Sequence, residues 1–243
     1  MKLPILLLVS LVAAYAVSVV LTVSVNPETT FWIEAVKQRE AAITEIREDS
    51  PDRPIVFFTG GSSCAFSIDP KIIEETCEIS AINLGLPVSS GARYILHQSL
   101  RIANKGDLIV VCLEPDLLTE PNQDSSPSKT GFALEARSGN LTDAAGGDTF
   151  DRSISIPEYL TLTRPGANYM ITLAGRSITG KGYRYKKDDI HYHGLIRTDV
   201  RDPGMTRTGY KDATSLHPEG RQLLETFASA AKQKGVRLAY SMP

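Results

Sequence analysis

Two serines, Ser62 and Ser63, directly follow a short apolar run and a Gly-Gly pair within the segment Ile55–Cys64. The run Ile55–Thr59 is typical of a buried strand, and the two glycines permit a tight turn into a following helix. A serine at this point lies at the carboxyl edge of a parallel sheet, where open α/β folds place their sites. With a base to accept its proton, the Ser62 hydroxyl is a candidate nucleophile, and free amides at the helix start could stabilise an oxyanion.

The same Gly-Gly-Ser-Ser segment allows other interpretations. It could be an ordinary tight turn with a serine N-cap, or a phosphate cradle built from helix amides. The Walker pattern and the dinucleotide fingerprint are not met, because the lysine of one and the third glycine of the other are missing. The nucleophile elbow Gly-x-Ser-x-Gly is missed by one residue, because Cys64 stands at the second glycine. Ser63 remains the alternative nucleophile, and Cys64 is expected to be a packed small side chain.

Length and composition indicate a globular protein of one domain plus appendages. The chain has 243 residues, of which 42% are hydrophobic and 22% charged. Its formal net charge of −2 provides no basic field, so no nucleic-acid partner is expected. The three cysteines, Cys64, Cys77 and Cys112, are too few for a disulfide framework, although one pair could form a bridge.

Residues 1–25 predict a transmembrane anchor. The stretch Pro4–Val25 carries no charge and exceeds the roughly 20 residues that cross a bilayer. Lys2 precedes it and Glu28 is the first charge after it, which places the N-terminus in the cytoplasm. The alternative is a cleaved signal peptide, although its apolar region is usually shorter, about 7–15 residues. We therefore expect a single-pass protein of the cell membrane, with its soluble domain on the extracytoplasmic side.

The remaining chain divides into residues 26–54, a juxtamembrane helix and linker, and residues 55–243, an α/β domain. Asn26 is a suitable N-cap for the helix, because proline and an acidic residue follow it directly. Further strands are predicted at Ile79–Leu84 and Leu108–Leu113, with helices between them. Ser89 and Ser90 can cap the helix that runs to about Asn104. This alternation predicts a mostly parallel sheet with right-handed crossovers.

A long insertion is predicted at about residues 119–211. Its first part, Glu120–Asp151, has little periodicity, which is typical of a lid or a flexible insertion. A helix at Pro218–Lys234 and a strand at Val236–Ser241 follow the insertion. Because a junction of a strand with a proline normally leads into a loop, we expect a last α/β unit beyond Pro243 and hence a domain that is incomplete at its C-terminus.

Several of these blocks together resemble the SGNH (GDSL-like) hydrolase superfamily, especially membrane-anchored bacterial members related to acyl-transfer proteins of the cell envelope. The resemblance covers about residues 55–118 and the last helix and strand. The matching blocks are Gly60-Gly61-Ser62, Ile68-Asp69-Pro70, Asn83-Leu84-Gly85 and His217-Pro218-Glu219-Gly220. Two departures stand out. Glu114 lies where many members carry Gly-x-Asn-Asp, and the Asp-x-x-His block is absent, because Asp212 and His217 are five residues apart.

The resemblance implies a flavodoxin-like three-layer sandwich in which Ser62 is the nucleophile and the amides of Ser62 and Gly85 form the oxyanion hole. It implies a hydrolase or O-acyltransferase that acts on acyl esters of envelope glycans or lipids, with no cofactor and no metal. His217 and Asp212 are candidates for the base and its partner, unless that pair lies beyond Pro243. The alternatives are a catalytically inactive binding or scaffold module of the same fold, and a phosphate-binding receptor.

Two smaller expectations concern polar residues near these blocks. Asn83 is expected to order the second loop through hydrogen bonds to the backbone. His191 and His193 would share one face if their segment were a strand, and with Asp188 and Asp189 they could bind a metal. A solvated loop is the favoured interpretation, because no third ligand has a recognisable spacing.

Overall fold

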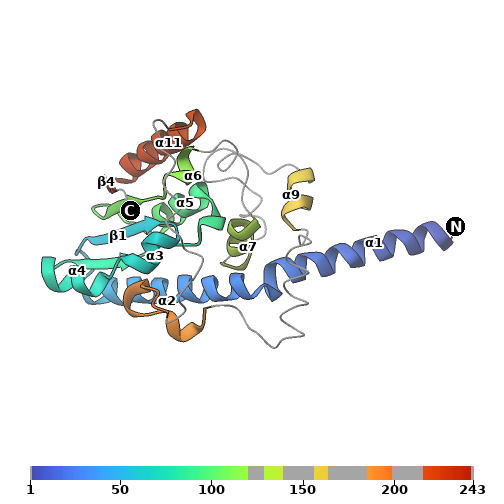
Figure 1. Cartoon of the computed structure of the whole chain (residues 1–243), viewed down its shortest axis with the longest axis horizontal. Coiled ribbons are helices and arrows are strands. Elements are labelled where there is room, and N and C mark those ends of the chain that lie inside the picture. The colour runs from blue at the N-terminus through green and yellow to red at the C-terminus, as the bar shows by residue number, and fades with distance from the viewer. Residues whose placement is uncertain (1, 120–128, 139–155, 164–184, 199–215, 242–243) are drawn as a thin grey trace. The chain divides into compact units, whose positions relative to one another are not determined.

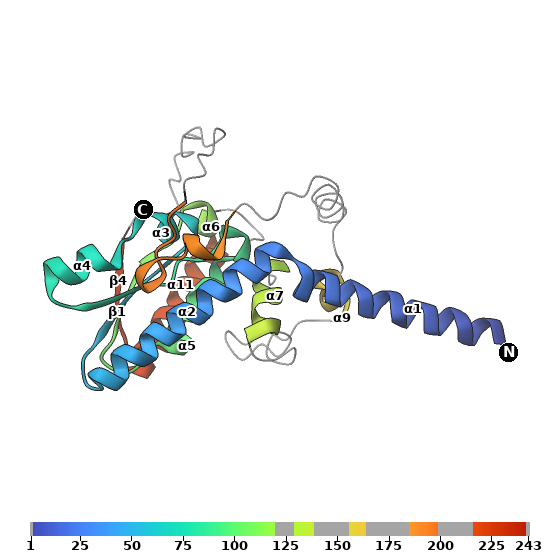
Figure 2. The ribbon, with the colours of Figure 1, turned by 90° about the horizontal axis from the view of Figure 1, so that it is seen from below.

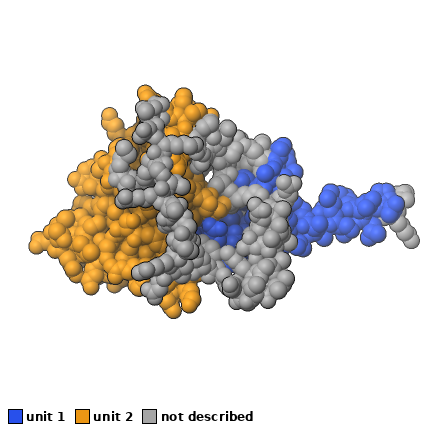
Figure 3. Space-filling view, in the orientation of Figure 1, with its two compact units in different colours: residues 1–33, 132–184 blue, residues 34–131, 185–243 orange. Residues whose placement is uncertain are grey.

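The computed structural model describes residues 2–119, 129–138, 156–163, 185–198 and 216–241. The chain forms two compact units, which Figure 3 distinguishes by colour. Unit 1 comprises residues 1–33 and 132–184, and unit 2 comprises residues 34–131 and 185–243. The predicted insertion is therefore divided between the two units.

Unit 1 begins with a long apolar helix, visible in Figures 1 and 2. This helix, α1 (Lys2–Val20), continues through a π-helical turn, η1 (Leu21–Val25). The 23 residues Leu3–Val25 are long and apolar enough to cross a membrane. An apolar N-terminal helix of spanning length was predicted from the sequence, and a signal sequence would have the same properties.

Two helices from the insertion contribute to unit 1. They are most of α7 (Lys129–Ser138) and all of α9 (Ile156–Leu162). Their buried side chains form a small apolar cluster with the end of the N-terminal helix, which consists of Val23, Phe132, Ala133 and Leu162. The expectation of no regular structure between residues 120 and 151 was wrong for α7, because contacts that periodicity does not reveal hold its apolar side chains in this cluster.

The helix α2 (Pro27–Asp49) begins as predicted. The Asn26 side chain accepts a hydrogen bond from the Glu28 amide at 3.0 Å, which is the expected N-cap. The C-terminal part of α2 belongs to unit 2, where Arg47 forms an ion pair with Asp107 at 3.0 Å.

Unit 2 is an α/β unit around a four-stranded, all-parallel sheet. Its strands are β1 (Ile55–Gly60), β2 (Ser80–Asn83), β3 (Leu108–Cys112) and β4 (Arg237–Tyr240), in the order β2-β1-β3-β4. The predicted parallel α/β architecture is confirmed at this level. The register pairs Phe58 with Asn83 and Gly60 with Cys112, so the residues that follow β1, β2 and β3 meet at one edge of the sheet.

Helices connect these strands. They are α3 (Ser62–Ser67), α4 (Pro70–Cys77), α5 (Ala92–Ile102), α6 (Asp116–Thr119) and α11 (Pro218–Lys234), with 3-10 turns η2 (Val88–Ser90), η3 (Lys187–Asp189) and η4 (Tyr192–Gly194). The expected helix from Ser89 to Asn104 is shorter than predicted. Gly91, at φ 79°, separates η2 from α5, and Ala103 is already extended.

A buried carboxylate holds the amino ends of two strands together. Asp107 accepts hydrogen bonds from the Ile55 amide at 2.8 Å, from the Asn104 amide at 2.6 Å and from Arg47. Because Ile55 begins β1 and Asp107 immediately precedes β3, this carboxylate fixes the edge of the sheet opposite to the serines.

Candidate active site

The turn between β1 and α3 requires both of its glycines. A Cβ atom on Gly60 would overlap the Cys112 carbonyl group, because β3 runs directly beside this turn. A Cβ atom on Gly61 would overlap the carboxylate of Glu114. The Gly-Gly pair therefore lets the Cys112 carbonyl and the Glu114 carboxylate approach the backbone closely.

Ser62 is the first residue of α3 and is half-buried. As the first helical residue, it has no acceptor within the helix for its amide. No hydrogen bond of its hydroxyl occurs within the described part of the chain. Ser62 thus presents a hydroxyl and an amide at the carboxyl edge of the sheet.

Ser63 is held by a carboxylate instead. Glu114, which follows β3, accepts hydrogen bonds from the Ser63 hydroxyl at 2.7 Å and from the Ser63 amide at 2.9 Å. Its second oxygen accepts from the Gly61 amide at 2.9 Å. The alternative nucleophile is therefore engaged in a charge-assisted hydrogen bond, whereas Ser62 is not.

Sequence reasoning identified the position of Glu114 but not its role. In the sequence alone, Glu114 is distinguished only as a departure from the SGNH pattern described above. An acidic residue directly after a parallel strand was the available signal, because such a residue lies at the edge that carries the serines. The register between Gly60 and Cys112 then brings its carboxylate onto the turn.

Asn83 connects the end of β2 to α3. Its side-chain amide donates to the Cys64 and Ile68 carbonyl groups, each at 2.8 Å, and its oxygen accepts from the Gly85 amide at 2.8 Å. The side chain is fully buried. The predicted role of Asn83, ordering this loop through backbone hydrogen bonds, is confirmed.

The Gly85 amide is consequently occupied in this structure. No side chain fits at Gly85, because a Cβ atom here would overlap the Ala65 amide. The group that approaches Gly85 is α3, and the amide itself is bonded to Asn83. A role for Gly85 in an oxyanion hole stays a prediction, and it requires this hydrogen bond to be exchanged.

His217 lies at the start of α11. Its amide donates to the Leu118 carbonyl at 3.0 Å, and its Nδ1 accepts from the Glu219 amide at 3.4 Å, so His217 is the N-cap. Because α11 leads into the parallel strand β4, its first residue lies toward the carboxyl edge of the sheet, as Ser62 and Glu114 do. The other candidate, Asp212, lies outside the described residues.

Two buried cysteines, Cys64 in α3 and Cys112 at the end of β3, lie against the turn that carries the serines. Cys64 is 1% exposed and Cys112 is 4% exposed, and both are free, as is the exposed Cys77. The neighbouring Cys112 thiol, followed by burial, raises the pKa of Cys64 well above its usual value, and the Cys64 thiol donates to the Asn83 side-chain oxygen at 3.7 Å. Cys64 is thus a neutral, packed side chain, as expected from the sequence.

The predicted metal residues have other contacts. Among the described residues, no group of three or more His, Cys, Asp or Glu side chains could hold a metal ion. His193 lies in a 3-10 turn at φ 47°, not in a strand. Its Nδ1 is 3.1 Å from the Ala81 carbonyl and 3.2 Å from Glu74, which itself accepts from the Ala81 amide. Glu74 and His193 therefore cover the outer backbone edge of β2.

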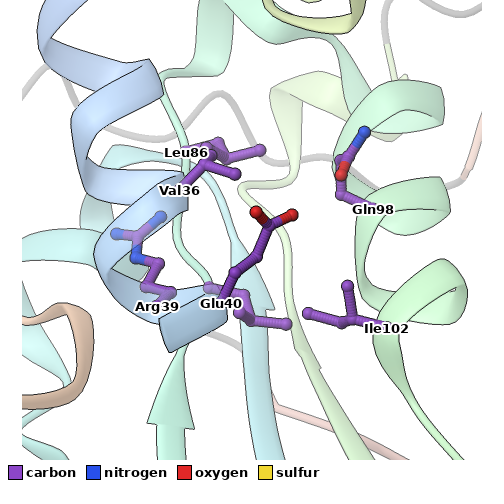
Figure 4. A pocket seen from close by; sticks show the side chains of 7 residues that line it. Val36, Arg39, Glu40, Leu86, Gln98 and Ile102 are labelled. Atoms are coloured by element: carbon purple, nitrogen blue, oxygen red, sulfur yellow. The ribbon is translucent and has the colours of Figure 1, made fainter. Parts of the chain in front are cut away.

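A separate indentation of about 300 Å³ lies between α2, α5 and the loop after β2. Figure 4 shows the Glu40 side chain extending from α2 toward the helix that carries Gln98 and Ile102. Arg39 also lines this indentation and donates to the Gly194 carbonyl at 3.0 Å, and burial lowers its pKa to about 10. None of the seven lining residues belongs to the serine site.

Comparisons with known proteins add no assignment. No family model matches the chain. No curated protein and no solved structure matches it either. The fold and the site therefore define only a class: an α/β protein with a parallel sheet, an apolar N-terminal helix and a serine at the carboxyl edge of β1.

Proposed function

We propose that this chain is a membrane-anchored serine hydrolase or O-acyltransferase that acts on acyl esters of envelope glycans or lipids, with Ser62 as its nucleophile. The observation that carries the proposal is the difference between the two serines. Among the described residues, the Ser62 hydroxyl at the carboxyl edge of the sheet has no hydrogen-bond partner, whereas the Ser63 hydroxyl is bonded to Glu114. The strand order β2-β1-β3-β4 also supports a flavodoxin-like arrangement.

In the proposed reaction, the Ser62 oxygen attacks the carbonyl carbon of an ester while a base takes the hydroxyl proton. The Ser62 amide stabilises the resulting oxyanion, a type of contact whose loss costs about 3 kcal/mol. The tetrahedral intermediate collapses, and the alcohol leaves with the proton from the base. Water or a sugar hydroxyl then takes the acyl group from Ser62, which regenerates the hydroxyl.

His217 is the described residue best suited to be the base. It is half-buried, lies toward the same edge of the sheet as Ser62, and accepts a hydrogen bond at Nδ1. An imidazole that accepts at Nδ1 carries its proton on Nε2 when neutral, so exchange of the Glu219 contact would precede proton transfer from Ser62. This requirement makes the side chain at position 217 a direct test of the mechanism.

The test is covalent labelling of the detergent-solubilised full chain with a fluorophosphonate probe, followed by peptide mass spectrometry. We expect the probe on Ser62, no labelling of Ser62→Ala, and retained labelling of the matched variant Ser63→Ala. His217→Ala should slow labelling without removing the acceptor site. Labelling that persists in Ser62→Ala, or no labelling of the unaltered chain, would refute the nucleophile.

The second candidate is a catalytically inactive binding or scaffold module with the same fold. The observation that favours it is the occupancy of the backbone amides around Ser62. Glu114 takes the amides of Gly61 and Ser63, and Asn83 takes that of Gly85. For this module we expect no fluorophosphonate labelling, combined with saturable binding of acetylated glycan fragments that Ser62→Ala leaves intact.

The proposed location follows from the apolar helix. With Lys2 before the span and the first later charge at Glu28, the helix would anchor the protein with the α/β unit outside the cytoplasm. Protease protection in intact cells tests this orientation. Unit 2 should be digested from outside, and its resistance would contradict the orientation.

A further inference from the structure

The C-terminal part of the apolar helix carries three polar side chains that share one hydrogen-bond partner, Thr163. Tyr15, Ser18 and Thr22 are spaced at intervals that place them on one helix face. The hydroxyls of Ser18 and Thr22 both donate to the carbonyl of Thr163 at 3.0 Å. The Tyr15 hydroxyl is 2.9 Å from the Thr163 hydroxyl. The three polar residues thus fasten the end of α9 to the helix.

These contacts lie at the depth of a bilayer if Leu3–Val25 spans it. At about 1.5 Å per residue, the 23-residue segment is about 34 Å long, against a hydrocarbon core of about 30 Å. Counted from Leu3, Ser18 lies about 22 Å along the axis and Thr22 about 28 Å. The Thr163 carbonyl, bonded to both, would therefore lie within about 8 Å of the boundary nearer to Val25.

A peptide carbonyl at that depth needs internal hydrogen bonds, because lipid provides no donor. Thr163 meets this requirement, since it is fully buried and its carbonyl accepts two hydroxyl donors. The apolar side of the contact is also closed, because Val23 and Leu162 belong to the same buried cluster. Satisfied polar groups inside an apolar contact are what a segment near the hydrocarbon requires.

The other side of α9 is apolar and exposed. Ile156 is 78% exposed and Leu160 is 47% exposed, and their spacing of four residues places them on one face. The helix α1 likewise exposes large apolar side chains close to Ser18 in the sequence, such as Val17 and Val20. The exposed apolar face of α9 therefore lies in the same unit as the lipid-facing surface of the anchor.

We propose that α9 is a membrane-contacting element, and that Ile156 and Leu160 insert into the acyl chains of the leaflet nearer to Val25. Thr163 fixes α9 to the anchor at an interfacial depth of about 5–10 Å, which is typical of helices at the headgroup boundary. An interfacial position suits the composition of α9, which carries one charged residue in seven. The anchor is consequently a structural part of unit 1, retained in the folded protein.

The test uses an environment-sensitive NBD label on single introduced cysteines in a Cys77→Ser background. The labelled full chain is reconstituted into phosphatidylcholine–phosphatidylglycerol vesicles, with or without doxyl-labelled lipids. We expect labels on Ile156→Cys and Leu160→Cys to emit at shorter wavelength and to be quenched by the doxyl lipids. A label on Thr161→Cys, on the same helix, should stay water-like, as should a label on Cys77 of the chain that retains this cysteine.

A label on Val9→Cys reports the anchor itself. Quenching at Val9 together with water-like emission at Ile156 and Leu160 would overturn the proposal, whether those residues contact water or a second protein. Absence of quenching at Val9 would overturn it as well, because the anchor would not be in the bilayer. Neither result affects the fluorophosphonate labelling of Ser62, so this proposal and the proposed function fail separately.

A second pair of variants tests the role of the hydroxyls. Ser18→Ala with Thr22→Ala leaves the Thr163 carbonyl without its two donors, so we expect loss of quenching at Ile156 while quenching at Val9 persists. Ser10→Ala is the matched control, because Ser10 is an exposed serine of the same helix. Unchanged quenching at Ile156 in the double variant would show that these hydrogen bonds do not fix α9.

Discussion

Replacement of Glu114 by alanine should loosen the turn that presents Ser62. The carboxylate accepts three hydrogen bonds, from the Gly61 amide, the Ser63 amide and the Ser63 hydroxyl. In Glu114→Ala, two amides at the start of α3 lose their acceptor in a half-buried position. Glu114→Gln keeps one acceptor oxygen but turns its amide NH2 group, a donor, toward these backbone amides. We therefore expect a loss of stability between those of the unaltered chain and Glu114→Ala.

The size of the effect follows from these contacts. A hydrogen bond to a charged group contributes about 1.5–3 kcal/mol, but bonds to one carboxylate are not additive and Glu114 is half-buried. We therefore expect Glu114→Ala to lower the free energy of unfolding of unit 2 by about 2–3 kcal/mol. For a chain of this size that corresponds to a decrease in Tm of roughly 4–12 °C.

The assay combines thermal unfolding in detergent, followed by circular dichroism, with hydrogen exchange of the peptide that contains residues 60–68. Ser63→Ala is the matched control, because it removes only the hydroxyl bond at 2.7 Å and should cost about 1.5 kcal/mol, the lower end of the range for a bond to a charged group. In the double variant, the Ser63 replacement should add little to the loss of Glu114. If Glu114→Ala destabilises the protein no more than Ser63→Ala does, then the carboxylate does not hold the turn.

Three further predictions follow from other contacts. Gly61→Ala should lower the Tm, because the added Cβ atom overlaps the Glu114 carboxylate. Combination with Glu114→Ala should recover part of this decrease in the same thermal assay, and no recovery would contradict the contact. Burial lowers the pKa of His97 to about 4, below its unfolded value of about 6.5. The contribution of neutral His97 to the free energy of unfolding is therefore fully present above pH 6.5, and up to about 3 kcal/mol is lost as the pH falls toward 4. Urea titrations across this range should show the decline, and His97→Gln should flatten it; an equally steep decline in that variant would exclude His97. Native maleimide labelling should modify Cys77 alone, because the other two cysteines are buried, and a second modified thiol would contradict that burial.

The sequence predicted the elements whose signals are local. The Asn26 cap, the apolar strand β3 and the helix α11 each depend on neighbouring residues, and all three are present in the structure. The start of α5 was less accurate, because both serines before Gly91 were acceptable caps. Only the conformation of Gly91, at φ 79°, separates the 3-10 turn from the helix.

The position of Ser62 at the edge of the sheet and the backbone contacts of Asn83 were predictable, because both residues lie at the end of a strand. The roles of Glu114 and Gly85 depend on partners outside their own segment or on a choice among nearby acceptors. The carboxylate reaches the Gly61 amide only because β3 pairs with β1 in one particular register. Likewise, nothing in the segment Asn83–Gly85 shows whether its last amide faces a substrate or the Asn83 side chain.

The order of the strands has a consequence for how the protein is made. Three of the four described strands lie within residues 55–112, whereas β4 begins at Arg237. During synthesis, β1, β2 and β3 can therefore pair long before β4 leaves the ribosome. Until then the outer edge of β3 is unpaired, and joining it to β4 closes a loop of more than one hundred residues, which slows folding. The late synthesis of β4 therefore leaves the β3 edge of a nascent chain open to aggregation and to chaperone binding.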